Sequence, residues 1–135
     1  MTYDEYRMLC QGAKKKVKPK NEEHQIQCAC VNWFRAQYPK DAMMLYAIPN
    51  GGRRDAITGR ILKDEGVLRG VADLNLDVPN KSYHGLRIEM KTKTGTQSSA
   101  QKEFQKNVEA RGYKYIVCRS LDDFMRQVTI YMLGT

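Results

Sequence analysis

The sequence predicts a mixed α/β fold in which helices lie on both sides of a small sheet. Residues 72–78 and 86–93 alternate apolar and polar side chains, a pattern typical of half-buried strands. Longer segments repeat apolar residues at intervals of three and four, which is typical of amphipathic helices. In chain order these patterns give helix, strand, helix, strand, strand, helix, strand, helix. We therefore expect one layered domain without internal repeats.

The composition narrows the class of protein. A chain of 135 residues is long enough for one hydrophobic core, and its formal charge of +8 favours a polyanionic partner such as nucleic acid. We find no run of about eighteen apolar residues, which excludes a transmembrane helix, and no signal-peptide pattern at the N-terminus. The four cysteines lack a framework spacing. Reduced thiols in a cytoplasmic protein are the simplest interpretation.

Residues 1–20 are expected to form a basic N-terminal arm, followed by a domain over residues 21–135. The arm contains Lys14, Lys15 and Lys16 in a run that also predicts a flexible tether. Such a run is either a solvated linker or a set of salt-sensitive, non-specific phosphate contacts.

The first predicted helix begins at Asn21, a good N-cap, and stops before Pro39. Glu23 lies in its first turn, where a carboxylate suits the helix dipole whether or not it has another role. The apolar stripe is expected to contain Ile26, Cys30, Trp33, Phe34 and Gln37.

A zinc site in this helix is disfavoured by the spacing of its candidate ligands. His24 and Cys28 are four residues apart, but Cys30 points away from Cys28 on a helix, and no fourth ligand has a suitable spacing. We therefore expect both cysteines to be small core residues.

The next segment, residues 42–48, is an apolar run of strand length that ends at Pro49-Asn50-Gly51-Gly52. A helix over residues 56–65 then has Ile57, Ile61 and Leu62 facing inward and Gly66 at its end. The alternative is a small hairpin that turns at Thr58-Gly59.

The central feature is an antiparallel hairpin with turn residues at 79–85. If the loop is centred near Lys81, Asp73 lies opposite Glu89, with Cβ atoms about 5 Å apart. Lys91 lies on the same face, two residues after Glu89. This face is either a solvated Asp–Lys–Glu ion cluster or a site for a hard divalent cation, which is typically held by one or two carboxylates.

The last third of the chain predicts helix, strand and helix. Ser98 to Gln101 fit a capping box, and the helix they begin ends at Gly112. A strand follows over residues 113–118. Ser120 begins the last helix, whose stripe is Leu121, Phe124, Met125, Val128 and Met132.

Asp73 followed by Glu89-Met90-Lys91 resembles the PD-(D/E)xK nuclease signature. Its proline is absent, because Ala72 stands before Asp73. The flanking segments sharpen the resemblance, and together they are similar to the VRR-NUC (virus-type replication-repair nuclease) domain in its stand-alone, phage-type form. These segments are Glu23-His24-Gln25-Ile26-Gln27, Ile48-Pro49-Asn50-Gly51-Gly52, Gly70-Val71-Ala72-Asp73-Leu74 and Gln101.

This resemblance implies a restriction-endonuclease-like mixed sheet flanked by helices, and a metal-dependent nuclease. By resemblance, Asp73 and Glu89 bind Mg²⁺ or Mn²⁺, the Met90 carbonyl completes the protein ligands, and Glu23 approaches the metal directly or through water. Lys91 positions or activates the attacking water. Gln101 either orients that water or Lys91, or only makes the helix-start hydrogen bond. Contacts to DNA are expected from Lys14, Lys15, Lys16, Asn50, Arg53, Arg54 and Lys93.

The leading hypothesis is a Holliday-junction resolvase that acts as a homodimer in a bacterial cytoplasm, encoded by the host or by a phage. A two-fold dimer suits a junction with two strands to cut. The N-terminal arm and Tyr131-Met132-Leu133 are candidate dimer surfaces. The alternatives are a flap or duplex DNA nuclease and a non-catalytic basic DNA-binding domain.

Overall fold

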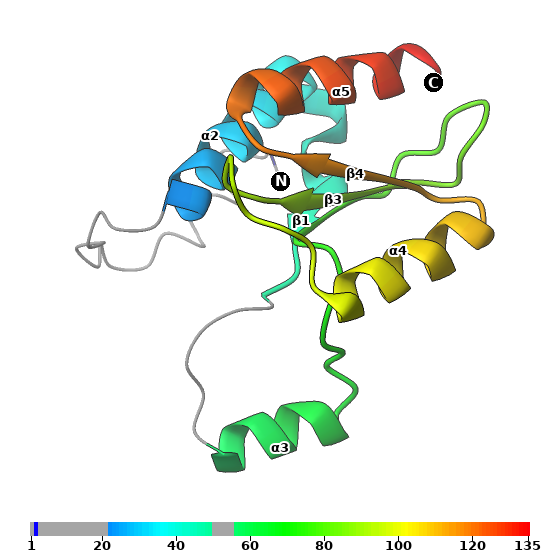
Figure 1. Cartoon of the computed structure of the whole chain (residues 1–135). Helices are drawn as coiled ribbons and strands as arrows, with labels where there is room; N and C mark the ends of the chain where they lie inside the picture. The colour runs from blue at the N-terminus through cyan, green and yellow to red at the C-terminus, as the bar shows by residue number, and fades with distance from the viewer. Residues whose placement is uncertain (1, 3–21, 50–55) are drawn as a thin grey trace.

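The computed structural model describes residue 2, residues 22–49 and residues 56–135, and these contain a four-stranded mixed sheet (Figure 1). The strands β1, β2 and β3 are successive antiparallel neighbours, and β4 is parallel to β3. The mixed α/β prediction is thereby confirmed. The strands are β1 (Leu45–Ala47), β2 (Leu74–Leu76), β3 (Leu86–Met90) and β4 (Lys114–Cys118).

Helices cover both faces of the sheet. On one face lie α2 (Glu22–Gln37) and α5 (Leu121–Leu133), and on the other lies α4 (Ser99–Ala110) (Figure 1). A parallel pair of strands needs a crossover connection, and α4 supplies it between β3 and β4. Within the described ranges, no helix is long and apolar enough to cross a membrane.

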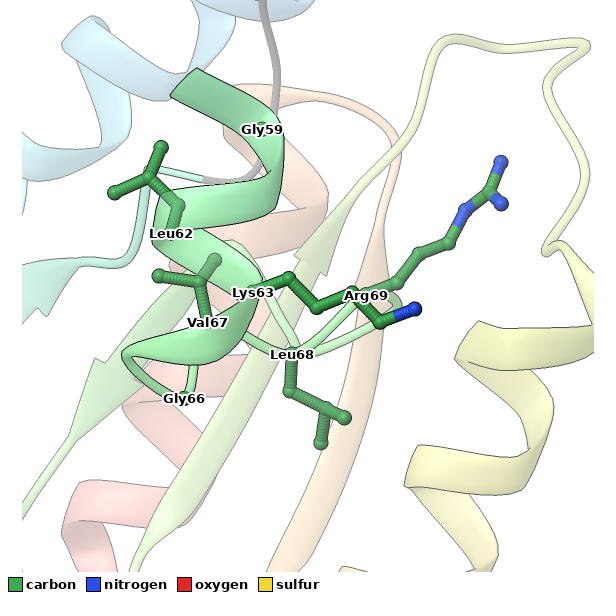
Figure 2. Close-up of a pocket in the computed structure, with 7 residues that line it drawn as sticks. All are labelled: Gly59, Leu62, Lys63, Gly66, Val67, Leu68 and Arg69. Carbon is green, nitrogen blue, oxygen red and sulfur yellow. The ribbon is translucent and has the colours of Figure 1, made fainter. Parts of the chain in front are cut away.

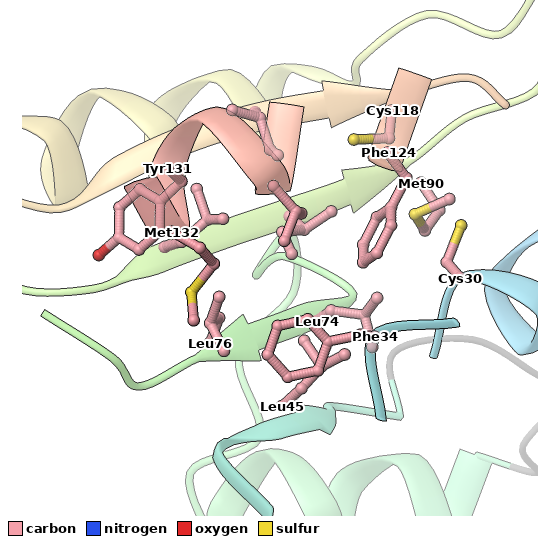
Figure 3. Packing of buried hydrophobic residues seen from close by; sticks show 14 residues of the cluster. Cys30, Phe34, Leu45, Leu74, Leu76, Met90, Cys118, Phe124, Tyr131 and Met132 are labelled. Carbon is pink, nitrogen blue, oxygen red and sulfur yellow. The ribbon is translucent and has the colours of Figure 1, made fainter. Parts of the chain in front are cut away.

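The hydrophobic core lies between the sheet and the α2–α5 pair (Figure 3). Leu74 and Ile88 are fully buried beneath Phe34 of α2 and Phe124 of α5. The ring of Trp33 meets that of Phe124 edge-on, with centroids 6.0 Å apart. The predicted stripes of both helices therefore face the core, except that Gln37 is exposed and Met125 is half-buried outside the core cluster.

The predicted register of the central hairpin is confirmed. Leu74 pairs with Ile88, and Leu76 pairs with Leu86. In the connecting loop, the Asn80 side chain accepts hydrogen bonds from the backbone N–H groups of Ser82 and Tyr83 at 2.9 and 2.8 Å. This local turn fixes the centre of the loop and therefore the strand pairing.

The strand predicted over residues 42–48 is shorter than expected. Residues 42–44 belong to a 3₁₀ helix, η1 (Pro39–Met44), and only Leu45–Ala47 pair with β2. The prediction failed because an apolar run indicates burial but not where strand pairing begins, and only three residues pair with β2.

The helix predicted over residues 56–65 is confirmed as α3 (Ala56–Asp64), so the small hairpin is excluded. Its predicted inward face is wrong. Ile57 is 75% exposed and Ile61 is 50% exposed, because α3 projects from the body of the sheet and only Leu62 is half-buried (Figure 1).

The prediction that Tyr131-Met132-Leu133 is a candidate dimer surface is also largely wrong. Tyr131 and Met132 are buried in the chain's own core, and the Tyr131 hydroxyl donates to the Val78 carbonyl at 2.6 Å. Leu133 is exposed. Asn21 and residues 3–20 of the basic arm lie outside the described residues.

Candidate active site

Asp73 directly precedes β2 and Glu89 lies on β3, at the end of the central hairpin. The register of β2 and β3, continued by one residue, places them opposite each other. Asp73 Oδ2 accepts a 2.7 Å hydrogen bond from the Met90 N–H. Because the N–H and C=O of one strand residue point to the same side, the Met90 carbonyl also points toward the Asp73 strand. Two carboxylates and one carbonyl are thus brought together at the end of the two central strands.

Glu89 is buried, with only 2% of its surface exposed. Its carboxylate lies on the sheet face that α4 covers, where Gln101 Nε2 donates to Glu89 Oε1 at 2.9 Å. The Tyr115 hydroxyl donates to Glu89 Oε2 at 3.4 Å. The alternative of a solvated charged face is therefore wrong for Glu89, because helix α4 excludes water from it.

Gln101 makes the helix-start hydrogen bond that the sequence left open, and in addition a contact to Glu89 that was not predicted. Its Oε1 accepts from the Ser98 N–H at 2.8 Å, and the Ser98 hydroxyl accepts from the Gln101 N–H at 3.2 Å, which completes the capping box. The Nε2 of the same amide holds Glu89. The start of α4 is therefore tied directly to the buried carboxylate.

Burial raises the pKa of the Glu89 carboxyl to about 8. The neighbouring Asp73 carboxylate adds to this rise, both through its charge and by accepting a hydrogen bond from protonated Glu89. The Lys91 ammonium and the Tyr115 hydroxyl act in the opposite direction. The site thus disfavours the charge on Glu89 unless a cation offsets it.

Lys91 follows the last residue of β3 and is half-buried. Its N–H donates to the Cys118 carbonyl at 3.0 Å, which extends the pairing with β4. The ion pairs within the described residues are Arg87–Asp77 and Arg126–Asp123. An ion cluster in which Lys91 directly pairs with Asp73 or Glu89 is therefore not formed in this part of the chain.

Glu23 lies in the first turn of α2 and is half-buried. Across residues 22–49 and 56–135, no three histidine, cysteine or acidic side chains form a group that could hold a metal. The structure thus does not join Glu23 to Asp73 and Glu89 in one three-ligand cluster. Two carboxylates nevertheless fit a magnesium-type ion, which commonly keeps several waters.

The donor set fits a hard divalent cation in a further respect. Carboxylates that ligate metals are usually held by hydrogen bonds from surrounding groups. Here the Met90 N–H holds Asp73, while Gln101 and Tyr115 hold Glu89. Oxygen ligands of this kind suit Mg²⁺ and Mn²⁺.

Sequence reasoning missed Tyr115 and Arg119. Tyr115 lies on β4 opposite Arg87, and burial followed by the Glu89 charge raises the pKa of its hydroxyl. The Arg119 guanidinium donates to the carbonyls of Thr92 and Gly95 at 2.8 and 2.6 Å, which anchors the loop after Lys91. Alternation along β4 could have indicated that Tyr115 lies on the same face of the sheet as Glu89. The sequence has no signal for the contact between Arg119 and the loop.

Gly70 makes a close contact with the start of α4. Its φ of +88° is unfavourable for other residues, and an added Cβ would lie 2.7 Å from the backbone carbon of Ala100. Ala100 directly precedes Gln101. The glycine therefore lets the chain that leads to Asp73 pass against the turn that holds Glu89.

The cysteines are only partly as predicted. Cys30 and Cys118 are buried, and burial raises the pKa of both thiols to about 12. Cys28 is exposed, so its assignment to the core is wrong, and its Sγ lies 3.6 Å from Nε2 of His24.

One of the predicted DNA-contact residues can be placed. Lys93 is exposed in the loop that follows Lys91. The others lie outside the described residues: Lys14, Lys15, Lys16, Asn50, Arg53 and Arg54.

Comparison with known proteins identifies the family. The VRR-NUC domain matches residues 11–122. A solved structure described as a VRR_NUC domain protein is similar to this chain, with a TM-score of 0.74 and 26% sequence identity over 87% of this chain and 93% of the other. Curated proteins give no match. The fold and the matched residues agree, and the chain belongs to the VRR-NUC family of nuclease domains.

Proposed function

We propose that this protein is a metal-dependent DNA endonuclease whose centre is the Asp73–Glu89 pair. The observation that carries the proposal is the buried Glu89 carboxylate opposite Asp73 at the end of the hairpin. A structural ion cluster would not require a carboxylate to be buried beside another acid without a paired cation. A bound divalent ion offsets that cost.

In this proposal Asp73, Glu89 and the Met90 carbonyl hold Mg²⁺ or Mn²⁺. The ion lowers the pKa of a bound water and polarises the phosphate when it is present. Gln101 holds Glu89 in its ligating orientation through the 2.9 Å hydrogen bond. Glu23 contributes through water from the first turn of α2.

Lys91 supplies a mobile positive charge near the scissile phosphate, where it positions or activates the attacking water. The support for this role is its place directly after β3 and its electrostatic effect on Glu89. Arg119 holds the adjoining loop, and Lys93 on that loop contacts the DNA backbone.

The substrate we propose is branched DNA, with a Holliday junction cut by a homodimer. The charge of +8 supports a nucleic-acid partner. Residues 1–20 act as a basic arm that adds phosphate contacts to the domain over residues 21–135. This activity would take place where bacterial or phage DNA is processed, in the bacterial cytoplasm.

The test compares cleavage of a four-way junction, a 5′ flap and a plain duplex, each with Mg²⁺, Mn²⁺ or EDTA. A resolvase gives paired, symmetric nicks in the junction only when divalent metal is present. Preferential cutting of the flap or duplex would replace the resolvase assignment with one of those nuclease types. Junction binding without nicking in either metal would instead support a non-catalytic DNA-binding domain.

A further inference from the structure

The side chains that hold the Glu89 carboxylate come from α4 and β4. A hollow of about 600 Å³, shown in Figure 2, is lined by residues 59–69 alone. The hydrogen bonds to Glu89 come instead from Gln101 and Tyr115. Residues that act on Glu89 from a distance are therefore the partners of these two side chains.

Gln97, in the loop between β3 and α4, contacts the Tyr115 hydroxyl. Its Nε2 lies 3.3 Å from Tyr115 Oη and 3.0 Å from Gln105 Oε1. An amide nitrogen only donates, and its two hydrogens supply one bond to each of these oxygens. Tyr115 Oη thus accepts from Gln97, and its single hydrogen remains for Glu89 Oε2, which lies 3.4 Å away.

Gln105 of α4 determines which end of the Gln97 amide faces Tyr115. If the amide were reversed, its oxygen would face Gln105 Oε1, and two acceptors would meet without a hydrogen between them. The reversed amide would also accept the Tyr115 hydrogen, which Glu89 would then lose. The Gln105 contact therefore sets the direction of the hydrogen bonds that lead to Glu89.

The burial of Tyr115 makes this direction important. Tyr115 is 6% exposed, and the Phe104 ring of α4 meets its ring edge-on, with centroids 6.5 Å apart. Buried polar groups depend on protein partners for their hydrogen bonds. At 3.4 Å the contact from Tyr115 to Glu89 is long, so its strength depends on where the hydroxyl hydrogen points. Gln97 thus decides how well Tyr115 holds Glu89.

We propose that Gln97 is a positioning residue of the metal centre, which directs the Tyr115 hydroxyl hydrogen to Glu89 Oε2 and so holds that carboxylate in its ligating orientation. This inference rests on the proposed function. Gln101 holds the other carboxylate oxygen, so both oxygens of Glu89 are fixed before an ion binds. Lys93 lies on the same loop as Gln97, so the orientation of Glu89 is tied to the loop proposed to contact DNA.

The test measures Mn²⁺ binding to the full chain by isothermal titration calorimetry, without DNA. Tyr115→Phe removes only the hydroxyl, and Gln97→Met removes the amide at nearly constant length. Asp73→Asn identifies the heat that belongs to this centre. Gln97 is half-buried in a loop, so its variant gives a result even if Tyr115→Phe does not fold.

We expect the Kd for Mn²⁺ to rise at least about tenfold in Tyr115→Phe and at least about threefold in Gln97→Met. The double variant should bind no more weakly than Tyr115→Phe alone, because Gln97 acts on Glu89 only through the hydroxyl. A merely structural effect of Gln97 would instead add to that of Tyr115.

The controls are Tyr113→Phe and Gln37→Met, which remove the same groups elsewhere. Tyr113 directly precedes β4, and its ring contacts Arg87 and His84. Gln37 is exposed at the end of α2, on the other side of the sheet from α4. Both controls should bind Mn²⁺ with wild-type affinity, and circular dichroism verifies that every variant is folded.

The positioning role and the nuclease activity can fail separately. An unchanged Kd in Gln97→Met, or losses that multiply in the double variant, would overturn the role of Gln97 and leave the metal centre intact. Wild-type protein that binds no Mn²⁺ would overturn both. Variants that weaken Mn²⁺ binding as expected, in a protein that cuts no DNA, would overturn the endonuclease and leave the role of Gln97.

Discussion

Gln101 joins the start of helix α4 to the buried Glu89 carboxylate. One end of its amide accepts from the Ser98 N–H at 2.8 Å, and the other donates to Glu89 at 2.9 Å. One side chain thus makes both a helix cap and a contact that orients the buried Glu89 carboxylate. Packing of α4 and the geometry of the candidate metal site therefore depend on each other.

Replacement of Gln101 by alanine should lower both stability and activity. It removes the N3 half of the capping box and leaves Glu89 without its donor, so we expect a loss of about 1–2 kcal/mol in the free energy of unfolding. We also expect kcat for DNA cleavage to fall at least about tenfold. Urea unfolding and single-turnover cleavage measure the two effects.

Ser98→Ala is the matched control for this variant. It removes the hydroxyl that accepts from the Gln101 N–H but leaves the Gln101 side chain on Glu89. Stability should fall by about 1 kcal/mol while kcat stays at the wild-type value. Equal losses of activity in Ser98→Ala and Gln101→Ala would contradict a separate effect of Gln101 on Glu89.

Metal-free protein should become less stable as the pH rises from about 4.5 to about 8. In this window the folded state keeps the Glu89 proton, because burial raises the pKa to about 8, whereas the unfolded chain loses it near 4.5. The folded state then binds more protons, so the free energy of unfolding falls with pH.

Glu89→Gln isolates this dependence. Relative to the wild type, the variant should be more stable at pH 8 than at pH 5, by on the order of a few kcal/mol. The measurement is urea unfolding of both proteins in EDTA at the two pH values. An unchanged difference between them would show that Glu89 is ionised in the folded protein throughout.

The sequence predicted the hairpin and its register well because local signals specify both. Strict alternation assigns the faces of Leu74 and Ile88, and the turn at Asn80 fixes which residues pair. The caps at Ser98 and Ser120 are equally local, and both are present. Features determined by a few neighbouring residues could therefore be predicted without knowledge of the fold.

Features that depend on distant partners could not be predicted. Glu89 pairs with Val117 of β4, and a helical crossover separates the two strands in the chain. A crossover does not fix the register between the strands that it joins. The contact of the Tyr115 hydroxyl with Glu89 was therefore not predicted. The apolar pattern of α3 predicted a buried face, yet no described part of the chain covers Ile57. Amphipathicity identifies the apolar side of a helix but not which surface covers it.

Lys91→Ala and Lys93→Ala should affect different kinetic parameters. Lys91 adjoins the carboxylates, so its loss should lower kcat at least about 100-fold with little change in DNA affinity. Lys93 is exposed on the following loop, so its loss should raise KM and reduce the salt dependence of binding. Steady-state cleavage and DNA titrations at several salt concentrations separate the two. Similar effects of both substitutions would argue against a catalytic role for Lys91.

Gly70→Ala should destabilise the protein more than Gly66→Ala. Both glycines have positive φ, but an added Cβ meets the Ala100 backbone at 2.7 Å at position 70 and nothing within 4 Å at position 66. The left-handed conformation alone should cost about 1–2 kcal/mol at Gly66, with a larger loss at Gly70. Thermal unfolding compares them, and equal losses would rule out a tight contact between Gly70 and α4.

The most direct measurement is cleavage of a labelled four-way junction by the wild type and by Asp73→Asn, with and without divalent metal. Asparagine keeps the size of the side chain and an oxygen that accepts from the Met90 N–H, but removes the charge. We expect nicking by the wild type in Mg²⁺ or Mn²⁺, none in EDTA, and a loss of at least about 100-fold in Asp73→Asn with junction affinity retained. Cleavage by Asp73→Asn at the wild-type rate, or wild-type cleavage undiminished by EDTA, would contradict a metal-dependent centre at Asp73 and Glu89.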